Sequence, residues 1–153
     1  MNPYNLNGDS GNPHAVILGA IDPENAGPGP FVMASDTLEH NSVIGPGGDR
    51  LGTVNHIMLD VVSGRVAYAV LSFGGFLGFG EKLFAVPWSA LTLDTERKSF
   101  VLGIDKAKLE AAPGFDKEHW PSMADPQWGT NIHEYYGRSP YWKDYRYERE
   151  AHP

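Results

Sequence analysis

Two neighbouring runs of sequence decide the fold: LGTVNHIMLDVV at residues 51–62 and VAYAVLSF at residues 66–73. Both are rich in the β-branched and aromatic residues that strands favour. Ser63 and Gly64, which separate them, suit a tight hairpin turn. The second run is apolar on both faces, which is typical of a central strand that is also covered on its outer side. The two runs therefore predict a long antiparallel hairpin at the centre of a sheet.

The first of these strands contains a break in its alternation. Ile57, Leu59 and Val61 share one face of an ideal strand, whereas Val54 stands three residues before Ile57 and falls on the other face. A bulge near Asn55 would turn Val54 and Ile57 to the same side. Because a bulge also bends its strand, the pattern indicates a curved sheet.

Shorter β runs surround this hairpin. Residues 82–87 predict a third strand, and residues 91–94 and 99–102 predict a second hairpin. Residues 31–35 are expected to form a further strand, and residues 15–18 either an edge strand or part of a mobile arm. Six short antiparallel strands favour a small closed barrel, because closure removes unpaired strand edges.

After residue 105 the pattern becomes helical. Asp105 is expected to cap a helix over residues 106–112, and Asp125 followed by Pro126 predicts a second helix that ends at Gly137. The apolar face of this second helix consists of residues one or two turns apart, Trp128, Ile132, Tyr135 and Tyr136.

Composition and charge exclude several classes of protein. The chain has no cysteine, which excludes disulfides and thiolate metal sites and fits a cytoplasmic location. Its formal net charge is −7, and no Lys or Arg precedes Arg50, so the basic surface that nucleic acid requires is not evident. The longest charge-free apolar stretch, residues 66–80, is shorter than the roughly 20 residues of a membrane helix. We therefore expect a soluble, cytoplasmic protein with no membrane span and no nucleic-acid partner.

The order and spacing of the β runs resemble those of the PRC-barrel family. The resemblance rests on the hairpin at residues 51–71, on GGFLG at residues 74–78 and on FAVPW at residues 84–88. The last two are similar to the glycine-rich turn and the "VPW" strand end of that family. Together the matching pieces extend over about residues 33–109.

This resemblance implies an all-β fold with short helical additions, in which a small antiparallel barrel is followed by C-terminal helices and extended tails. The family is named for the cytoplasmic barrel of the photosynthetic reaction-centre H subunit and includes the barrel of a small-subunit ribosome maturation factor. Such barrels serve in assembly or docking, and the family brings no catalytic residues. We expect an N-terminal arm at residues 1–30, the barrel at residues 31–105, and short helices with an aromatic tail at residues 106–153.

The large apolar side chains exceed what so small a core is expected to hide. Some stand in the glycine-rich run at residues 74–80, and others in residues 115–147, which hold half of the aromatic residues. Tyr and Trp suit interfaces because they combine a large area with a polar tip. The candidate interface comprises Phe76, Leu77, Phe79, Trp88, Trp120, Trp128, Tyr135, Tyr136, Tyr141 and Trp142.

No catalytic residue, cofactor or metal site is predicted. The glycine-rich run lacks the helix that follows a phosphate loop, because Lys82 leads into a strand. His119 and His133, fourteen residues apart, have no recognised zinc-ligand spacing. The serines show no nucleophile-elbow pattern.

The favoured function is accordingly a non-enzymatic protein-interaction or assembly module, which forms a homodimer or higher homo-oligomer and docks an unidentified protein partner. One alternative is an RNA-processing or ribosome-associated factor, which would bind more weakly as salt rises. Another is a reaction-centre-like electron-transfer accessory subunit or a small-molecule binder. A small-molecule binder would show a deep pocket with convergent polar groups.

Overall fold

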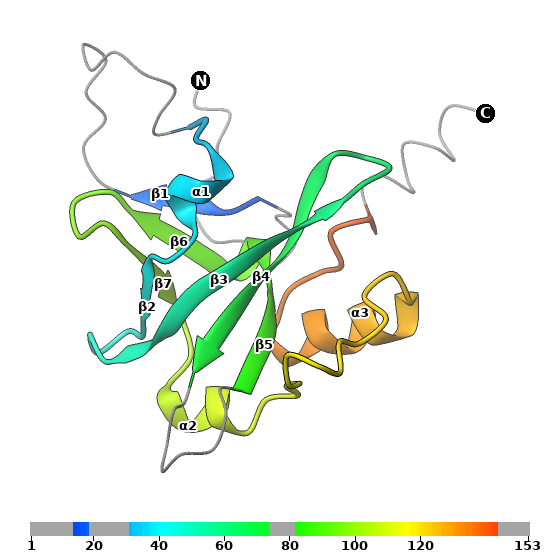
Figure 1. Ribbon diagram of the computed structural model, residues 1–153. Helices are drawn as coiled ribbons and strands as arrows, with labels where there is room; N and C mark the ends of the chain where they lie inside the picture. Colours follow the sequence, from blue (N-terminus) through cyan, green and yellow to red (C-terminus); the bar gives the residue numbers. More distant parts are fainter. Residues whose placement is uncertain (1–13, 19–30, 74–81, 144–153) are drawn as a thin grey trace.

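The computed structural model describes residues 14–18, 31–73 and 82–143 (Figure 1). Most of the regular structure in these residues is strand, and the helices are short. In chain order the elements are β1 (Val16–Leu18), α1 (Ser35–Leu38), β2 (Ser42–Ile44), β3 (Arg50–Asp60), β4 (Arg65–Phe73), β5 (Lys82–Pro87), the 3-10 helix η2 (Trp88–Ala90), β6 (Leu91–Asp94), β7 (Ser99–Leu102), α2 (Lys106–Glu110) and α3 (Pro126–Tyr135). The all-β class with short helical additions is therefore confirmed.

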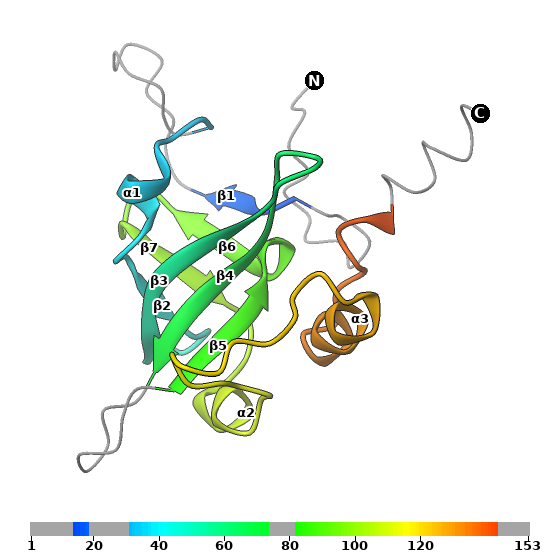
Figure 2. The same cartoon turned by 45° about the vertical axis from the view of Figure 1, so that its right-hand side comes forward.

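The seven strands form one curled sheet in the order β1-β6-β7-β2-β3-β4-β5. Figure 2 shows β3, β4 and β5 on one side of the molecule and β6 and β7 on the other. The pairings of β1 with β6 and of β2 with β7 are parallel, and the other pairings are antiparallel. Among the described strands β1 and β5 do not pair, so hydrogen bonds do not close the sheet.

The sequence predicts a closed, wholly antiparallel barrel, and the sheet differs from it in two details. Its end strands β1 and β5 do not pair, and two of its pairings are parallel. The parallel contact of β2 with β7 joins two antiparallel groups, one built on the β3–β4 hairpin and one on the β6–β7 hairpin. Such a contact between distant segments leaves no local mark in the hydrophobic pattern, because strand direction is set by the connections between strands.

The β3–β4 hairpin contains the expected bulge. The register between the two strands shifts between Val54 and His56, which leaves Asn55 as the extra residue of β3. Val54 is fully buried, and Ile57 is partly buried against the same core. The bulge therefore turns both side chains inward, as the broken alternation of the sequence predicts.

The far end of this hairpin projects beyond the rest of the sheet (Figure 1). The β2 strand pairs with β3 only as far as Thr53, and β5 pairs with β4 only from Tyr68 onward. The turn is held by Asp60, whose Oδ1 accepts hydrogen bonds from the backbone amides of Val62 and Ser63, each at 3.1 Å. A two-stranded ribbon with an ordered turn therefore stands clear of the neighbouring strands.

The core lies inside the curl of the sheet and is filled by aliphatic and aromatic side chains. These side chains come from β2 to β7, so that both sides of the sheet contribute to one continuous cluster. The fully buried members include Val43, Leu51, Val54, Leu71, Phe84, Leu91, Phe100 and Leu102.

Both C-terminal helices begin at the predicted caps. The Asp105 side chain accepts a hydrogen bond from the backbone amide of Lys108 at 2.8 Å, and Asp125 accepts one from that of Gln127 at 3.0 Å. The α3 helix packs beside β5 and against β4, so that β4 is buried on both faces, as expected for a central strand (Figure 2).

The segment before β2 differs from the prediction. Residues 31–34 form a turn and bends instead of a strand, and α1 begins at Ser35 with Ala34 at its N-cap and no side-chain cap. The edge-strand alternative for residues 15–18 is confirmed, because β1 pairs with β6 at one end of the sheet.

Gly52 of β3 is expected to tolerate no side chain. A Cβ at this position would overlap the carbonyl oxygen of Ser72 on β4, and the residue has a φ of +155°. Gly52→Ala should therefore lower the free energy of unfolding by about 1–3 kcal/mol in urea denaturation. Gly103→Ala is the control, because a Cβ there meets nothing within 4 Å. Equal losses in the two variants would contradict this explanation.

Candidate interaction surface

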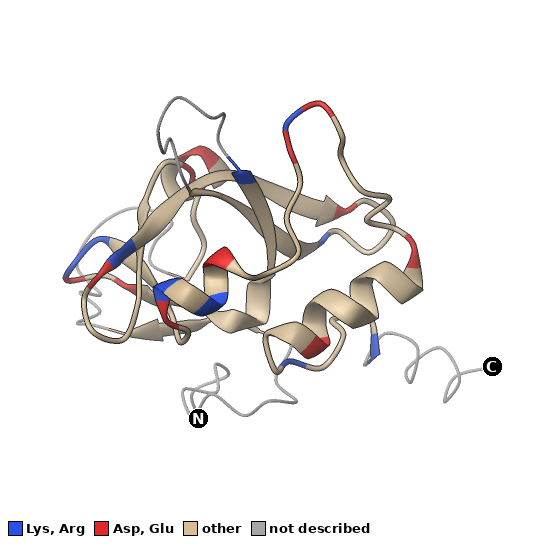
Figure 3. Ribbon diagram, turned by 90° about the horizontal axis from the view of Figure 1, so that it is seen from below, with Lys and Arg blue, Asp and Glu red and all other residues tan. Residues whose placement is uncertain are grey.

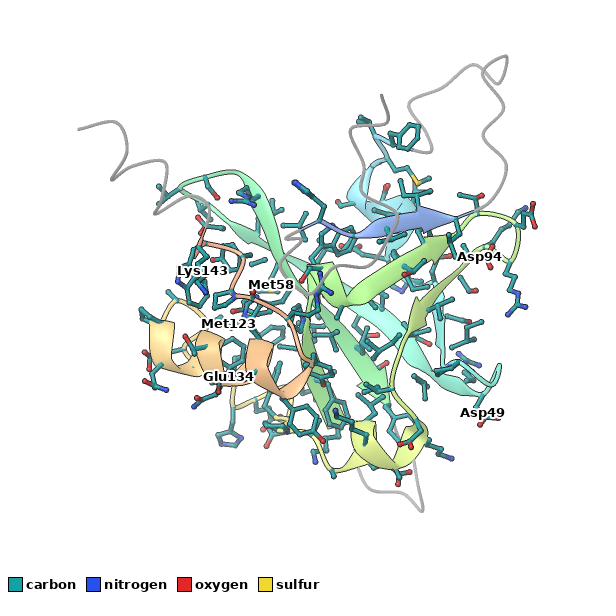
Figure 4. The ribbon with its side chains drawn as sticks, turned by 180° about the vertical axis from the view of Figure 1, so that it is seen from behind. Asp49, Met58, Asp94, Met123, Glu134 and Lys143 are labelled. Carbon is teal, nitrogen blue, oxygen red and sulfur yellow. The ribbon has the colours of Figure 1, made fainter. Side chains whose placement is uncertain are left out.

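An apolar groove separates the projecting end of the β3–β4 hairpin from the segments that flank α3. Its volume is about 490 Å³. Met58 lines it from the hairpin, and Met123, Ala124 and Tyr141 line it from the other side. Figure 4 shows Met58 and Met123 close together between the hairpin and α3. Asp60 is the one charged side chain among the described residues that line the groove.

The apolar end of the hairpin stands in solvent beside this groove. The exposed fractions are 59% for Leu59, 91% for Val61 and 87% for Val62, and these three residues are called the hairpin tip below. A single exposed apolar side chain needs no explanation. Three that adjoin one another and also line an apolar groove form a contiguous patch, which is typical of a contact surface.

Asp60 links the hairpin tip to the C-terminal segment. Its Oδ2 accepts a hydrogen bond from the Tyr141 hydroxyl at 2.8 Å, while its Oδ1 accepts the two amides of the turn. The backbone hydrogen bond from Ser63 is the main reason that the pKa of Asp60 lies below its usual value, and partial burial opposes this shift. Burial raises the pKa of Tyr141, and its hydrogen bond to the carboxylate raises it further. The one charge in the groove is therefore supplied with donors from within the chain.

A cluster of rings holds the C-terminal segment against the sheet. The ring centroid of Tyr68 on β4 lies 5.3 Å from that of Trp128, 5.4 Å from that of His133 and 5.9 Å from that of Tyr141. Trp142 lies 5.5 Å from His133. Several of these contacts are edge-to-face, an arrangement that aromatic pairs favour. Burial raises the pKa of Tyr68, whose hydroxyl has no hydrogen-bond partner among the described residues.

His133 is the fully buried histidine of this cluster. Its Nδ1 lies 2.7 Å from the carbonyl oxygen of Gly129, and its Nε2 accepts the backbone amide of Tyr141 at 3.3 Å. The two contacts define a neutral ring that donates at Nδ1 and accepts at Nε2. Burial holds the pKa of His133 below its usual value, the bond to Gly129 opposes this shift, and the charge of Arg138 adds to it.

Gly129 of α3 makes room for the same cluster. A Cβ at this position would lie 2.7 Å from the Trp142 ring and 2.8 Å from the Tyr68 hydroxyl oxygen. The rings therefore lie directly on the backbone of the helix.

Most of the aromatic residues that the sequence assigns to an interface pack within the chain. Trp128, Tyr141 and Trp142 belong to the ring cluster, and Tyr136 is buried. The Tyr135 hydroxyl donates to the carbonyl oxygen of Lys108 at 2.6 Å. These contacts account for much of the apolar area that suggested self-association, so an interface at these residues stays a prediction.

The remaining interface candidates lie elsewhere. Trp88 packs with its ring 5.8 Å from that of Phe100. Trp120 is 40% exposed, and its ring lies 5.4 Å from His56 and 5.0 Å from Phe115. Three candidates lie outside the described residues, namely Phe76, Leu77 and Phe79.

The sequence does not predict two features of this region, the exposed hairpin tip and the burial of His133. The hairpin tip is marked by Val61 and Val62, which occupy the first two positions of the turn at residues 61–64, where polar residues ordinarily stand. His133 is marked by its position next to Ile132 on the apolar face of α3. Both signals are single residues or pairs, and neither forms a recognised motif.

A second, smaller hollow lies between α1, β1 and the barrel. It has a volume of about 160 Å³ and is lined by apolar side chains that include Ile17, Met33 and Phe100. It adjoins another hollow of about 200 Å³ that shares Met33 and Leu38. Neither brings several charged groups together.

Charged residues of both signs occur in the described part of the chain. Figure 3 shows segments of both signs interspersed over turns and helices in that view. Within residues 14–18, 31–73 and 82–143, no three His, Asp or Glu side chains converge as metal ligands would. No helix of this part of the chain is long and apolar enough to cross a membrane.

Comparison with known proteins gives one family match. The family model described as PRC-barrel domain matches residues 32–109, which is about half of the chain. No protein of curated function matches.

Among solved structures, one similar chain is RimM of Pseudomonas aeruginosa, assigned to 16S ribosomal RNA processing. The two chains are 20% identical over the aligned part, with a TM-score of 0.33. The alignment covers 49% of this chain and 45% of that one, so it spans less than half of either.

The buried state of His133 predicts a loss of stability in acid. Because its folded pKa lies below the unfolded value of about 6.5, the unfolded chain binds the proton first. The contribution of the neutral His133 ring to the free energy of unfolding should therefore be present above about pH 6.5 and be lost as the pH falls below that value. The slope for one proton is at most about 1.4 kcal/mol per pH unit. Urea denaturation between pH 7.5 and pH 5 measures this slope.

His133→Gln should flatten the pH slope of the free energy of unfolding. His56→Gln, which removes an exposed histidine, is the control and should leave the slope as it is in the unsubstituted chain. An unchanged slope in His133→Gln would assign the acid sensitivity to another group.

Proposed function

The chain belongs to the PRC-barrel domain family, and from this membership and the hairpin tip we propose that it is a non-enzymatic protein-interaction module. It binds another protein chain at the groove beside the hairpin tip. The observation that carries the proposal is the contiguous apolar surface formed by Leu59, Val61 and Val62 and by the groove they line. Such a surface stays exposed at a cost in free energy unless a partner covers it.

The chemistry of the groove favours a protein partner. Its two methionines, Met58 and Met123, are flexible and polarisable side chains that adapt to apolar surfaces. Asp60, the one charged side chain among the described residues that line it, already accepts three hydrogen bonds, so covering the groove leaves this carboxylate with its donors. Among the described residues no Lys or Arg lines it, whereas nucleic acid is bound through such side chains.

A role without catalysis is supported by what the titratable groups of this region do. Asp60 orders the hairpin turn and holds Tyr141, and His133 bonds the backbone of α3 and of the C-terminal segment. Each of these polar contacts has a structural explanation. Asp60 and His133 therefore both serve to hold the surface that we propose for binding.

A photo-crosslinking residue at position 61 tests the proposal in the native cell. We expect a discrete protein adduct, because the Val61 side chain is 91% exposed at the hairpin tip. The same residue at position 32 is the control, since Val32 is also a largely exposed valine, 66% accessible, on a different part of the surface. The mass of the adduct distinguishes a second copy of the chain, another protein and a nuclease-sensitive RNA.

A groove-filling substitution makes the test specific. Ala124→Trp in the crosslinking chain should abolish the adduct from position 61, because Ala124 lines the groove and is exposed. The proposal is wrong if position 61 gives no protein adduct, if position 32 gives the same adduct, or if the adduct is RNA. It is also wrong if the filled groove leaves the yield unchanged.

A further inference from the structure

We infer that the occupant of the groove is the hairpin tip of a second copy of this chain, so that two copies form a reciprocal dimer. The inference rests on the proposed function and names its partner. It is carried by the shape of one surface, in which a projecting apolar tip and an apolar groove adjoin each other.

A protrusion and a recess on the same face are the requirement for a self-complementary contact. In a two-fold dimer each surface meets an identical surface, so each tip that enters the partner's groove is matched by the reverse insertion. Here Val61 and Val62 both project and form one wall of the groove. The tip of a second copy would therefore lie between the first copy's own tip and the opposite wall at Met123 and Ala124.

Electrostatics also permit a contact between two copies at this place. Each chain has a formal net charge of −7, so two copies repel each other overall. In the described part of the chain the groove and tip contain one acid, Asp60, whose oxygens accept hydrogen bonds from the turn amides and the Tyr141 hydroxyl. Two copies can therefore cover this patch without placing unengaged carboxylates against each other.

The geometry of β3 favours insertion of side chains over pairing of strand edges. Beyond Val54 the outer edge of β3 pairs with no other described strand, so edge-to-edge pairing is the competing arrangement. The β3–β4 register shifts twice, between Val54 and His56 and between Met58 and Leu59. Such irregularities twist an edge and interrupt the regular ladder that an added strand needs.

Sedimentation equilibrium of the full chain tests the inference. The unsubstituted chain should be a dimer at micromolar concentration, and Val62→Glu should raise the dimer dissociation constant at least about tenfold, because a charge then enters the partner's groove. Val32→Glu is the matched control, since it places the same charge at an exposed valine elsewhere, and it should leave the dimer intact. A cooperative thermal unfolding transition shows that each variant is folded, and a dissociated variant should unfold at a lower temperature than the dimer because it loses the stabilisation that association gives.

A mixing experiment tests the reciprocal arrangement itself. Ala124→Lys places a base in the groove and should also yield a monomer. A mixture of Val62→Glu chains and Ala124→Lys chains should form a heterodimer. In one contact the introduced Glu meets the introduced Lys, and in the other an unsubstituted tip enters a groove that keeps Ala124 on its wall opposite the substituted tip. A contact between the two tips alone would give no such rescue.

The inference is overturned if the unsubstituted chain remains a monomer up to about 100 μM, if Val62→Glu remains a dimer, or if Val32→Glu dissociates equally. It is also overturned if the mixture forms no heterodimer. A monomer whose position 61 crosslinks to a different protein, with loss of the adduct in Ala124→Trp, overturns the dimer and leaves the proposed function standing. A monomer without any such adduct overturns both.

Discussion

Tyr68 lies on the face of β4 that α3 covers, and the need to bury this ring determines how the C-terminal third of the chain is arranged. The rings of Trp128, His133 and Tyr141 surround it, and Asp60 fixes Tyr141 from the hairpin side. The described part of this cover does not reach the end of the hairpin, whose strands extend past their neighbours β2 and β5. The groove and the exposed tip follow from this difference in length.

Local chemistry made much of the fold predictable. Asp105 and Asp125 cap their helices, and the spacing of Val54 and Ile57 requires the bulge. The hairpin turn falls where the sequence predicts one and Gly64 has a positive φ, but the turn has four residues, because β3 ends at Asp60 and Val61 and Val62 belong to the turn. In each case the residues that carry the signal are within a few positions of the structure they produce. The family resemblance then supplied the order in which these elements assemble.

Features that depend on distant contacts were not predictable in this way. The parallel pairing of β2 with β7 and the ring cluster join segments far apart in the sequence. The aromatic residues at 128–142 were expected at an interface because sequence alone does not reveal that Tyr68 would gather them. The sequence does not predict the exposure of the hairpin tip, because Val61 and Val62 continue a strand-like apolar run. They are exposed because the hairpin extends past the end of β5.

Gly129 has a consequence for what holds α3 in its helical conformation. Glycine within a helix lowers helix propensity by about 1 kcal/mol relative to alanine, and helices shorter than about 12 residues are marginal by themselves. The α3 helix has ten residues, with Gly129 in its second turn. Its helical conformation therefore depends on docking against β4 and β5, and we expect its amides to exchange with solvent faster than those of β4.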